Sequence, residues 1–242
     1  MENKPTTDKI VIVVHGFKRQ GTNDFTDFVE YATDKVKYPI HNFTFFENEQ
    51  KNTLGYKTMS SRIGTEFSKF ADKEIIVIGY SIGGLSAIAH SVKMNNITAI
   101  YSIVPAYKIK YFEWITSLKS NFKKSRQLKK RLSKKAYKRM IEIKKAGLKE
   151  EYPLKIVNNM NKLRKYSGKT LKNVENKDIK FVFSKNDEVI AMDRTLRFID
   201  SKLDNSKNNI DKYRWVEQTH GTILTKGNYE AFDDIVNWIN KR

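Results

Sequence analysis

Residues 74–92 read EIIVIGYSIGGLSAIAHSV and contain three features in a fixed order. Glu74–Gly79 is a strongly apolar run that predicts a buried strand. The pentapeptide Gly79-Tyr80-Ser81-Ile82-Gly83 follows it as G-x-S-x-G, and an apolar helical pattern begins around Ser81. This order is typical of a nucleophile elbow, in which a strained turn lifts a serine hydroxyl clear of the sheet. Ser81 is therefore the candidate nucleophile.

The two outer glycines of the motif have a steric reason. Gly79 and Gly83, two residues before and two after the serine, come close together in such a turn and must lack side chains. The helix that follows presents free N–H groups and a positive field to a developing oxyanion. The alternative interpretation is that these glycines merely allow a strand and a helix to pack closely.

Working outward from the elbow, apolar runs alternate with helical patterns. This alternation predicts a parallel sheet with crossover helices. The expected strands are Lys9–Val14, Asn42–Phe46, Glu74–Gly79, Ile97–Val104, Ile179–Phe183 and Tyr213–Val216. The expected helices cover about residues 24–36, 57–70, 81–92, 189–203 and 228–238.

Residues 107–172 interrupt the alternation and contain only basic helical patterns. From residue 106 to 172 there are 22 Lys or Arg and four acids, a charge of +18 out of the +19 of the whole chain. We expect residues 1–106 and 173–242 to form the core, and 107–172 an inserted helical cap. Its lysines are first interpreted as the solvated back of a helix whose apolar face packs inward. Peripheral contact with anionic lipid is the alternative, and nucleic-acid binding is less favoured.

A serine nucleophile needs a histidine base and a carboxylate that orients the base. His220 follows the last expected strand and Asp187 follows the strand before it, so both fall at the carboxyl edge of the sheet. The order serine, acid, histidine is that of a nucleophile-elbow hydrolase. Glu188 competes with Asp187 for the acid role. The other three histidines are His15 and His41, which precede the serine, and His90, which we expect to be a packing residue of the elbow helix.

The first expected strand ends in His15-Gly16-Phe17. A glycine turn here can direct the backbone N–H of Phe17 toward the elbow, where the N–H of Ile82 is the second donor of an oxyanion hole. An ordinary glycine turn at Gly16 is the alternative.

Composition limits the remaining chemistry. The 242 residues suffice for one sizeable core, and the chain has no cysteine, which excludes disulfides and thiolate metal sites. The polar N-terminus and the short apolar runs lead us to expect a cytoplasmic protein. No metal-ligand cluster, phosphate loop or dinucleotide fingerprint is found, so we expect no metal and no cofactor.

With these motifs the sequence resembles the α/β-hydrolase superfamily, most closely its small bacterial esterases and monoacylglycerol-lipase-like members. The resemblance implies an α/β, three-layer α/β-hydrolase fold with a mostly parallel sheet and an inserted helical cap. Members of the family usually have an antiparallel hairpin before the first His-Gly strand. Because that strand begins at about residue 9 here, we expect the hairpin to be missing and the sheet to have about six strands. It also implies a serine hydrolase that cleaves small acyl esters through Ser81, Asp187 and His220. A lysophospholipase or acyl-thioesterase is the enzymatic alternative. A hydrolase-fold scaffold that binds polyanions is the non-enzymatic one.

Overall fold

The computed structural model describes residues 8–17, 25–45, 55–110, 154–187, 189–215, 219–220 and 222–242. Six strands form one sheet in the order β2-β1-β3-β4-β5-β6. Every neighbouring pair among them is parallel. The strands are β1 (Lys9–Val14), β2 (Ile40–Asn42), β3 (Glu74–Tyr80), β4 (Ile97–Ile103), β5 (Asp178–Ser184) and β6 (Asn209–Trp215).

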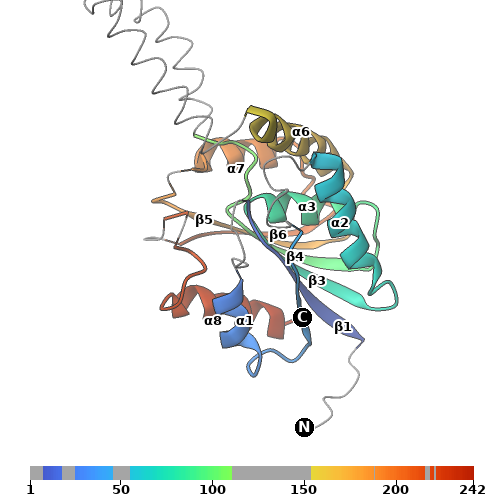
Figure 1. Cartoon of the computed structure of the whole chain (residues 1–242), viewed down its shortest axis with the longest axis vertical. Coiled ribbons are helices and arrows are strands. Elements are labelled where there is room, and N and C mark those ends of the chain that lie inside the picture. The colour runs from blue at the N-terminus through green and yellow to red at the C-terminus, as the bar shows by residue number, and fades with distance from the viewer. Residues whose placement is uncertain are drawn as a thin grey trace, which may run out of the picture.

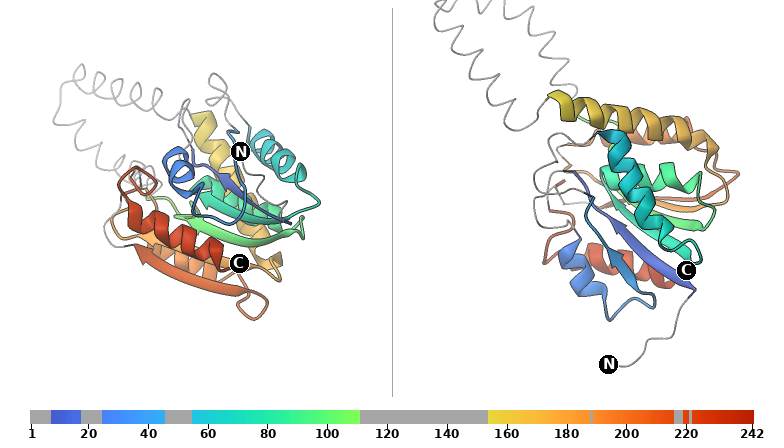
Figure 2. Two further views of the ribbon diagram at one scale, coloured as in Figure 1. Left: turned by 90° about the horizontal axis from the view of Figure 1, so that it is seen from below. Right: turned by 45° about the vertical axis from the view of Figure 1, so that its right-hand side comes forward.

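Helices cover both faces of this sheet (Figure 1), which makes the three layers of an α/β-hydrolase fold. On one face lie α1 (Thr26–Ala32) and α8 (Tyr229–Asn240). The other face carries α2 (Tyr56–Ser68), α3 (Ile82–Ser91), α6 (Leu154–Thr170) and α7 (Met192–Asp200), and a short 3-10 turn, Leu171–Asn173, follows α6. The right-hand view in Figure 2 shows α1 and α8 across the sheet from α2, α3 and α6.

The strands β1 and β3 contain continuous apolar runs, as expected where helices cover both faces of a sheet. Residues 11–14 of β1 and 75–78 of β3 are fully buried. Such runs, without polar alternation, are what a parallel sheet between two helical layers requires. The predicted α/β class and six-stranded sheet are thus confirmed.

Two strand boundaries differ from the prediction. β2 ends at Asn42, where the predicted strand begins, because its pairing with β1 starts at Ile40 opposite Val11. β6 begins at Asn209, four residues earlier than predicted, because Asn209 pairs with Asp178 at the start of β5. The end of β2 and the start of β6 are set by pairing with neighbouring strands, which a local sequence pattern does not reveal.

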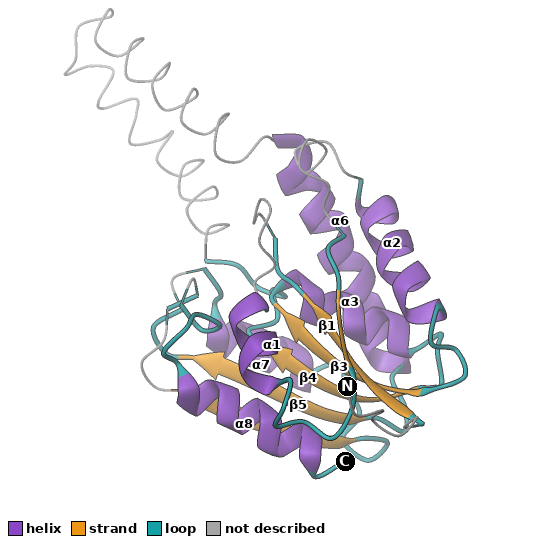
Figure 3. Ribbon diagram, turned by 60° about the horizontal axis from the view of Figure 1, so that its bottom comes forward, coloured by secondary structure: helices purple, strands orange, loops and turns teal. Residues whose placement is uncertain are grey.

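The end of the predicted cap is a helix of the core layer. α6 packs against α3 and α2 (Figure 3), and the Ser167 hydroxyl donates a hydrogen bond to the Leu85 carbonyl of α3 at 2.8 Å. Residues 111–153, which carry most of the predicted cap, lie outside the described residues. A cap over the sheet therefore stays a prediction for that segment.

Candidate active site

Ser81 occupies a strained turn between β3 and α3. Its backbone angles are φ 55° and ψ −112°, a combination that side-chain-bearing residues rarely adopt. The main chain holds it there, since its N–H donates to the Ile103 carbonyl at 2.8 Å. The residue is 6% exposed and caps the N-terminus of α3. This is the backbone geometry that a nucleophile elbow requires.

The glycines flanking Ser81 lie in space that no side chain could share. A Cβ on Gly79 would come within 2.7 Å of the Gly84 backbone, and one on Gly83 within 2.0 Å of the Val14 carbonyl oxygen. Gly83 therefore allows α3 to start directly against the end of β1. Close packing and a functional elbow make the same steric demand here, so the glycines alone do not separate the two interpretations.

Asp187 and His220 are joined by a hydrogen bond. The His220 Nδ1 lies 2.7 Å from Asp187 Oδ2, and the Asp187 side chain is 2% exposed. The other carboxylate oxygen, Oδ1, accepts from the backbone N–H groups of Val189 at 2.8 Å and Ile190 at 2.6 Å. The carboxylate is thus fixed from both sides and turned toward the imidazole.

Tyr80 links the histidine loop to the elbow. Its hydroxyl donates to the His220 carbonyl, and its ring lies 5.2 Å from the imidazole, centroid to centroid. Because Tyr80 is the residue before Ser81, this contact brings the His220 loop to the carboxyl end of β3. Lys110 supports the acid loop on the opposite side, where its Nζ donates to the Asp187 carbonyl at 2.6 Å.

His15 organises the loop that follows β1. Its Nδ1 lies 2.7 Å from the Gly16 carbonyl oxygen, and its Nε2 faces the Phe45 N–H at 3.1 Å and the Thr44 hydroxyl at 3.3 Å. One neutral tautomer, protonated on Nδ1, satisfies these contacts. Burial lowers the pKa of His15 to about 4, although the hydrogen bond to Gly16 acts the other way. The ring stacks on Phe45 at 4.0 Å.

The hydrogen bond from His15 has a consequence for Phe17. In a trans peptide the C=O and the following N–H point in opposite directions, and the described residues contain no cis peptide. Holding the Gly16 carbonyl against the His15 ring therefore turns the Phe17 N–H away from that ring. The second predicted donor, Ile82, is the first residue of α3, a position whose N–H has no partner within its own helix.

Three side chains at this edge were not singled out from the sequence as functional: those of His15, Tyr80 and Lys110. The sequence gives His15 no role because it precedes the serine, and it gives Tyr80 none because that position of the G-x-S-x-G motif can hold any residue. Lys110 carries no local signal, because its partner Asp187 is 77 residues away.

The other candidates have structural partners. His90 is part of α3, where its Nε2 lies 3.3 Å from the Ser60 hydroxyl and its ring packs edge-on against Phe67. His41 pairs with Glu66 at 2.9 Å. Glu188 lies outside the described residues. Within the described ranges no three His, Asp or Glu side chains gather as metal ligands would, and no helix there is long and apolar enough to cross a bilayer.

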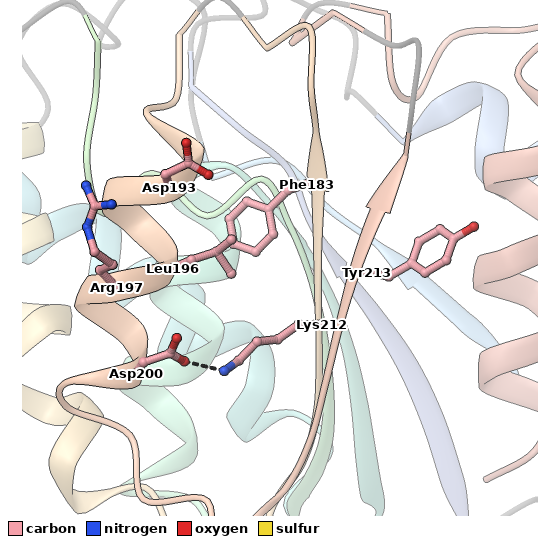
Figure 4. Close-up of a pocket in the computed structure, with 7 residues that line it drawn as sticks. All are labelled: Phe183, Asp193, Leu196, Arg197, Asp200, Lys212 and Tyr213. Atoms are coloured by element: carbon pink, nitrogen blue, oxygen red, sulfur yellow. Dashed lines mark hydrogen bonds and ion pairs between the residues drawn. The ribbon is translucent and has the colours of Figure 1, made fainter.

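Two cavities in the described part of the chain lie away from Ser81. One, of about 440 Å³, lies between α7 and the edge strand β6 (Figure 4). Its walls include Phe183, Leu196 and Tyr213, and an Asp200–Lys212 ion pair crosses it. The other, of about 780 Å³, lies beside α6. Neither is lined by Ser81, Asp187 or His220.

Comparison with known proteins identifies the fold. No family model and no curated protein matches the sequence. Among solved structures, a soluble variant of monoglyceride lipase from Saccharomyces cerevisiae superposes with a TM-score of 0.65 at 12% identity, over 98% of this chain and 87% of that one. Mouse alpha/beta hydrolase domain-containing protein 10 gives a TM-score of 0.65 at 14% identity, over 96% and 90%. A lipase-esterase related protein from Clostridium acetobutylicum gives 0.59 at 14%, over 98% and 96%. The resemblance to α/β-hydrolases is thus confirmed at the level of the fold.

Proposed function

We propose that this α/β-hydrolase-fold protein is a serine hydrolase that cleaves carboxylic esters. The observation that carries the proposal is the hydrogen bond between Asp187 and His220, in a loop tied by Tyr80 to the strained elbow at Ser81. A carboxylate hydrogen-bonded to a histidine, together with a serine in this backbone conformation, is the set of groups that activates a hydroxyl. The esterase and lipase names among the similar structures agree with this chemistry.

In the first half-reaction, His220 Nε2 takes the proton of the Ser81 hydroxyl as its oxygen attacks the ester carbonyl. Asp187 holds Nδ1–H, which fixes the tautomer and stabilises the imidazolium. The N–H groups of Phe17 and Ile82 bind the tetrahedral oxyanion. The imidazolium then protonates the alcohol as it leaves, and the acyl group remains on Ser81.

In the second half-reaction, His220 removes a proton from water as that water attacks the acyl-enzyme. The intermediate collapses to the carboxylic acid, and the proton returns to the Ser81 oxygen. The side chain of His15 supports both halves indirectly, because it holds the peptide whose N–H belongs to Phe17.

Hydrolysis assays test this proposal. The purified chain should hydrolyse p-nitrophenyl esters of increasing acyl length, and Ser81→Ala should remove that activity to the level of the uncatalysed reaction. Ser86→Ala is a matched control, since Ser86 lies in the same helix and its hydroxyl donates only to the Ile82 carbonyl at 3.0 Å. Unchanged hydrolysis by Ser81→Ala would contradict the proposal.

Parallel assays with monoacylglycerol, lysophospholipid and acyl-CoA assign the substrate class. A clear preference for acyl-CoA or lysophospholipid would support the thioesterase or lysophospholipase alternative. Binding to polyanions without turnover of any substrate would support the scaffold alternative. Lipid contact through the basic cap, residues 107–172, stays a prediction, tested by salt-sensitive binding to anionic but not neutral vesicles.

A further inference from the structure

A concave, strongly basic surface lies between α6 and α7. We define the α6–α7 groove by the cavity of about 780 Å³. Six of its lining residues are basic and none is acidic; the basic ones are Lys108, Arg164, Lys165, Lys169, Lys172 and Lys202. This density of like charge costs free energy unless an anion is present.

The floor of the groove is closely packed. Gly168 of α6 lies against Phe198 of α7 so closely that a Cβ there would come within 2.9 Å of the Phe198 ring. The rings of Tyr107 and Phe198 lie 5.4 Å apart, and the Tyr107 hydroxyl is 3.1 Å from the Ser167 hydroxyl. Close contacts among α6, α7 and the segment that follows β4 therefore form the floor of the groove.

Arg164 is held by its guanidinium group, and Lys108 is anchored through its backbone. The Arg164 guanidinium donates to the Tyr107 carbonyl at 3.1 and 2.9 Å and to Asn161 Oδ1 at 2.7 Å. The backbone of Lys108 is tied to α7, since its carbonyl accepts from the Ala191 N–H at 2.8 Å. Its Nζ lies 4.2 Å from the centre of the Phe198 ring.

The surroundings of Lys108 and Arg164 disfavour their positive charge. Burial, and then the nearby charges of Arg164 and Arg194, lower the pKa of Lys108. Burial and Arg194 likewise lower the pKa of Arg164. Both cations are thus less stable in the charged form than in water, which is the condition that a bound anion relieves.

We propose that the α6–α7 groove binds a soluble small molecule bearing several phosphate groups, at a site separate from Ser81. Phosphate fits because Arg and Lys donors hold its oxygens through charge-assisted hydrogen bonds. Two to three linked phosphates match the number of cations better than one. A single molecule fits a hollow between two helices, whereas the flat face of a membrane does not reach its floor. The aromatic rings of Tyr166 and Phe198 offer apolar contact to the remainder of the ligand.

Calorimetric titration with inorganic tripolyphosphate at 150 mM NaCl tests the site. The wild-type chain should bind one equivalent. The double variant Lys169→Gln/Lys172→Gln should bind at least about tenfold more weakly. The matched control is Lys162→Gln/Lys241→Gln, which removes the same charge at two exposed lysines outside the groove and should change affinity less than about twofold. Thermal unfolding without ligand shows whether both double variants keep the wild-type fold.

Two outcomes would overturn the proposal. If both double variants bound tripolyphosphate equally weakly, or if the wild-type chain bound several equivalents, the binding would reflect net charge and not a specific site. Failure to bind tripolyphosphate, together with groove-dependent binding to phosphatidylglycerol vesicles, would show that the surface recognises lipid headgroups instead. Because binding is measured directly, neither outcome depends on whether Ser81 is catalytic.

Discussion

At the scale of single residues, Asp187 uses its two carboxylate oxygens for different tasks. Oδ1 accepts from two backbone N–H groups and shapes its own loop, while Oδ2 faces the imidazole of His220. The structural and the chemical contribution of this side chain can therefore be separated by substitution.

Asp187→Asn should lower kcat by about 10⁴-fold, because the amide N–H₂ facing Nδ1 favours the tautomer that cannot accept the serine proton. The side-chain oxygen of the asparagine can still accept the hydrogen bonds from the backbone N–H groups of Val189 and Ile190. The free energy of unfolding should therefore stay within about 1 kcal/mol of wild type. Asp187→Ala should lower both quantities. The measurements are steady-state ester hydrolysis and urea unfolding, and an Asn variant with full activity would exclude the proposed role.

A second residue-scale prediction concerns His15, whose pKa burial lowers to about 4 from its ordinary 6.5. Between these values the unfolded chain binds a proton that the folded chain does not, so the free energy of unfolding should fall as the pH decreases from 6.5 to 4. Once the pH is below both pKa values, the loss in the free energy of unfolding amounts to about 3 kcal/mol. His15→Gln should flatten this pH dependence.

Urea unfolding at pH 7 and pH 4.5 measures the effect on both chains. Burial also lowers the pKa of His90, so part of the pH dependence should remain in the variant. If the variant lost as much stability on acidification as the wild type, His15 would not carry this proton linkage.

At the scale of elements, the junction of β1, β3 and α3 positions the candidate nucleophile. A Cβ added to Gly83 would lie 2.0 Å from the Val14 carbonyl oxygen, so only glycine lets α3 begin this close to β1. Gly83→Ala must therefore push α3 away from the end of β1. We expect a loss of at least about 3 kcal/mol of unfolding free energy, since the obstructing atom belongs to backbone and cannot turn aside.

Gly55→Ala serves as the comparison for this substitution. A Cβ there meets only the Thr58 hydroxyl at 3.8 Å, and the residue has φ −71°, which alanine adopts freely. Its cost should stay below about 1 kcal/mol. Denaturant unfolding of the two variants measures the difference. A similar loss of unfolding free energy in both would show that the elbow accepts a methyl group that its geometry excludes.

The elements that sequence predicts well are those whose signal is local. β1, β3 and the start of α3 follow from continuous apolar runs and from G-x-S-x-G. Asp187 and His220 follow from their positions after strands. Contacts across the sheet carry no such signal: Tyr80 meets the His220 carbonyl across 140 residues, and Lys110 meets the Asp187 carbonyl across 77. The limits of β2 and β6 also depend on partner strands, and the place of α6 in the core layer depends on its packing against α3.

At the scale of the whole molecule, the positive charge is unevenly distributed. Residues 106–172 carry +18 of the net +19, and part of this segment lines the α6–α7 groove. Such a field raises the local concentration of anionic molecules and their association rate, an effect that salt screens over about 10 Å at 0.1 M.

If the chain acts on acyl esters, the positive field should make kcat/KM for an anionic substrate depend on salt concentration. Raising NaCl from 20 to 300 mM should lower kcat/KM for acyl-CoA by at least about fivefold, and for a neutral p-nitrophenyl ester by less than about twofold. Equal salt dependence for the two substrates would mean that the charge does not act on approach to Ser81.

An activated Ser81 should react with a fluorophosphonate probe, which intact-mass and peptide mass spectrometry detects. We expect one adduct on the wild-type chain, located at Ser81, and none on Ser81→Ala. An adduct of equal yield on the variant, or one located at another residue of the wild type, would contradict the account.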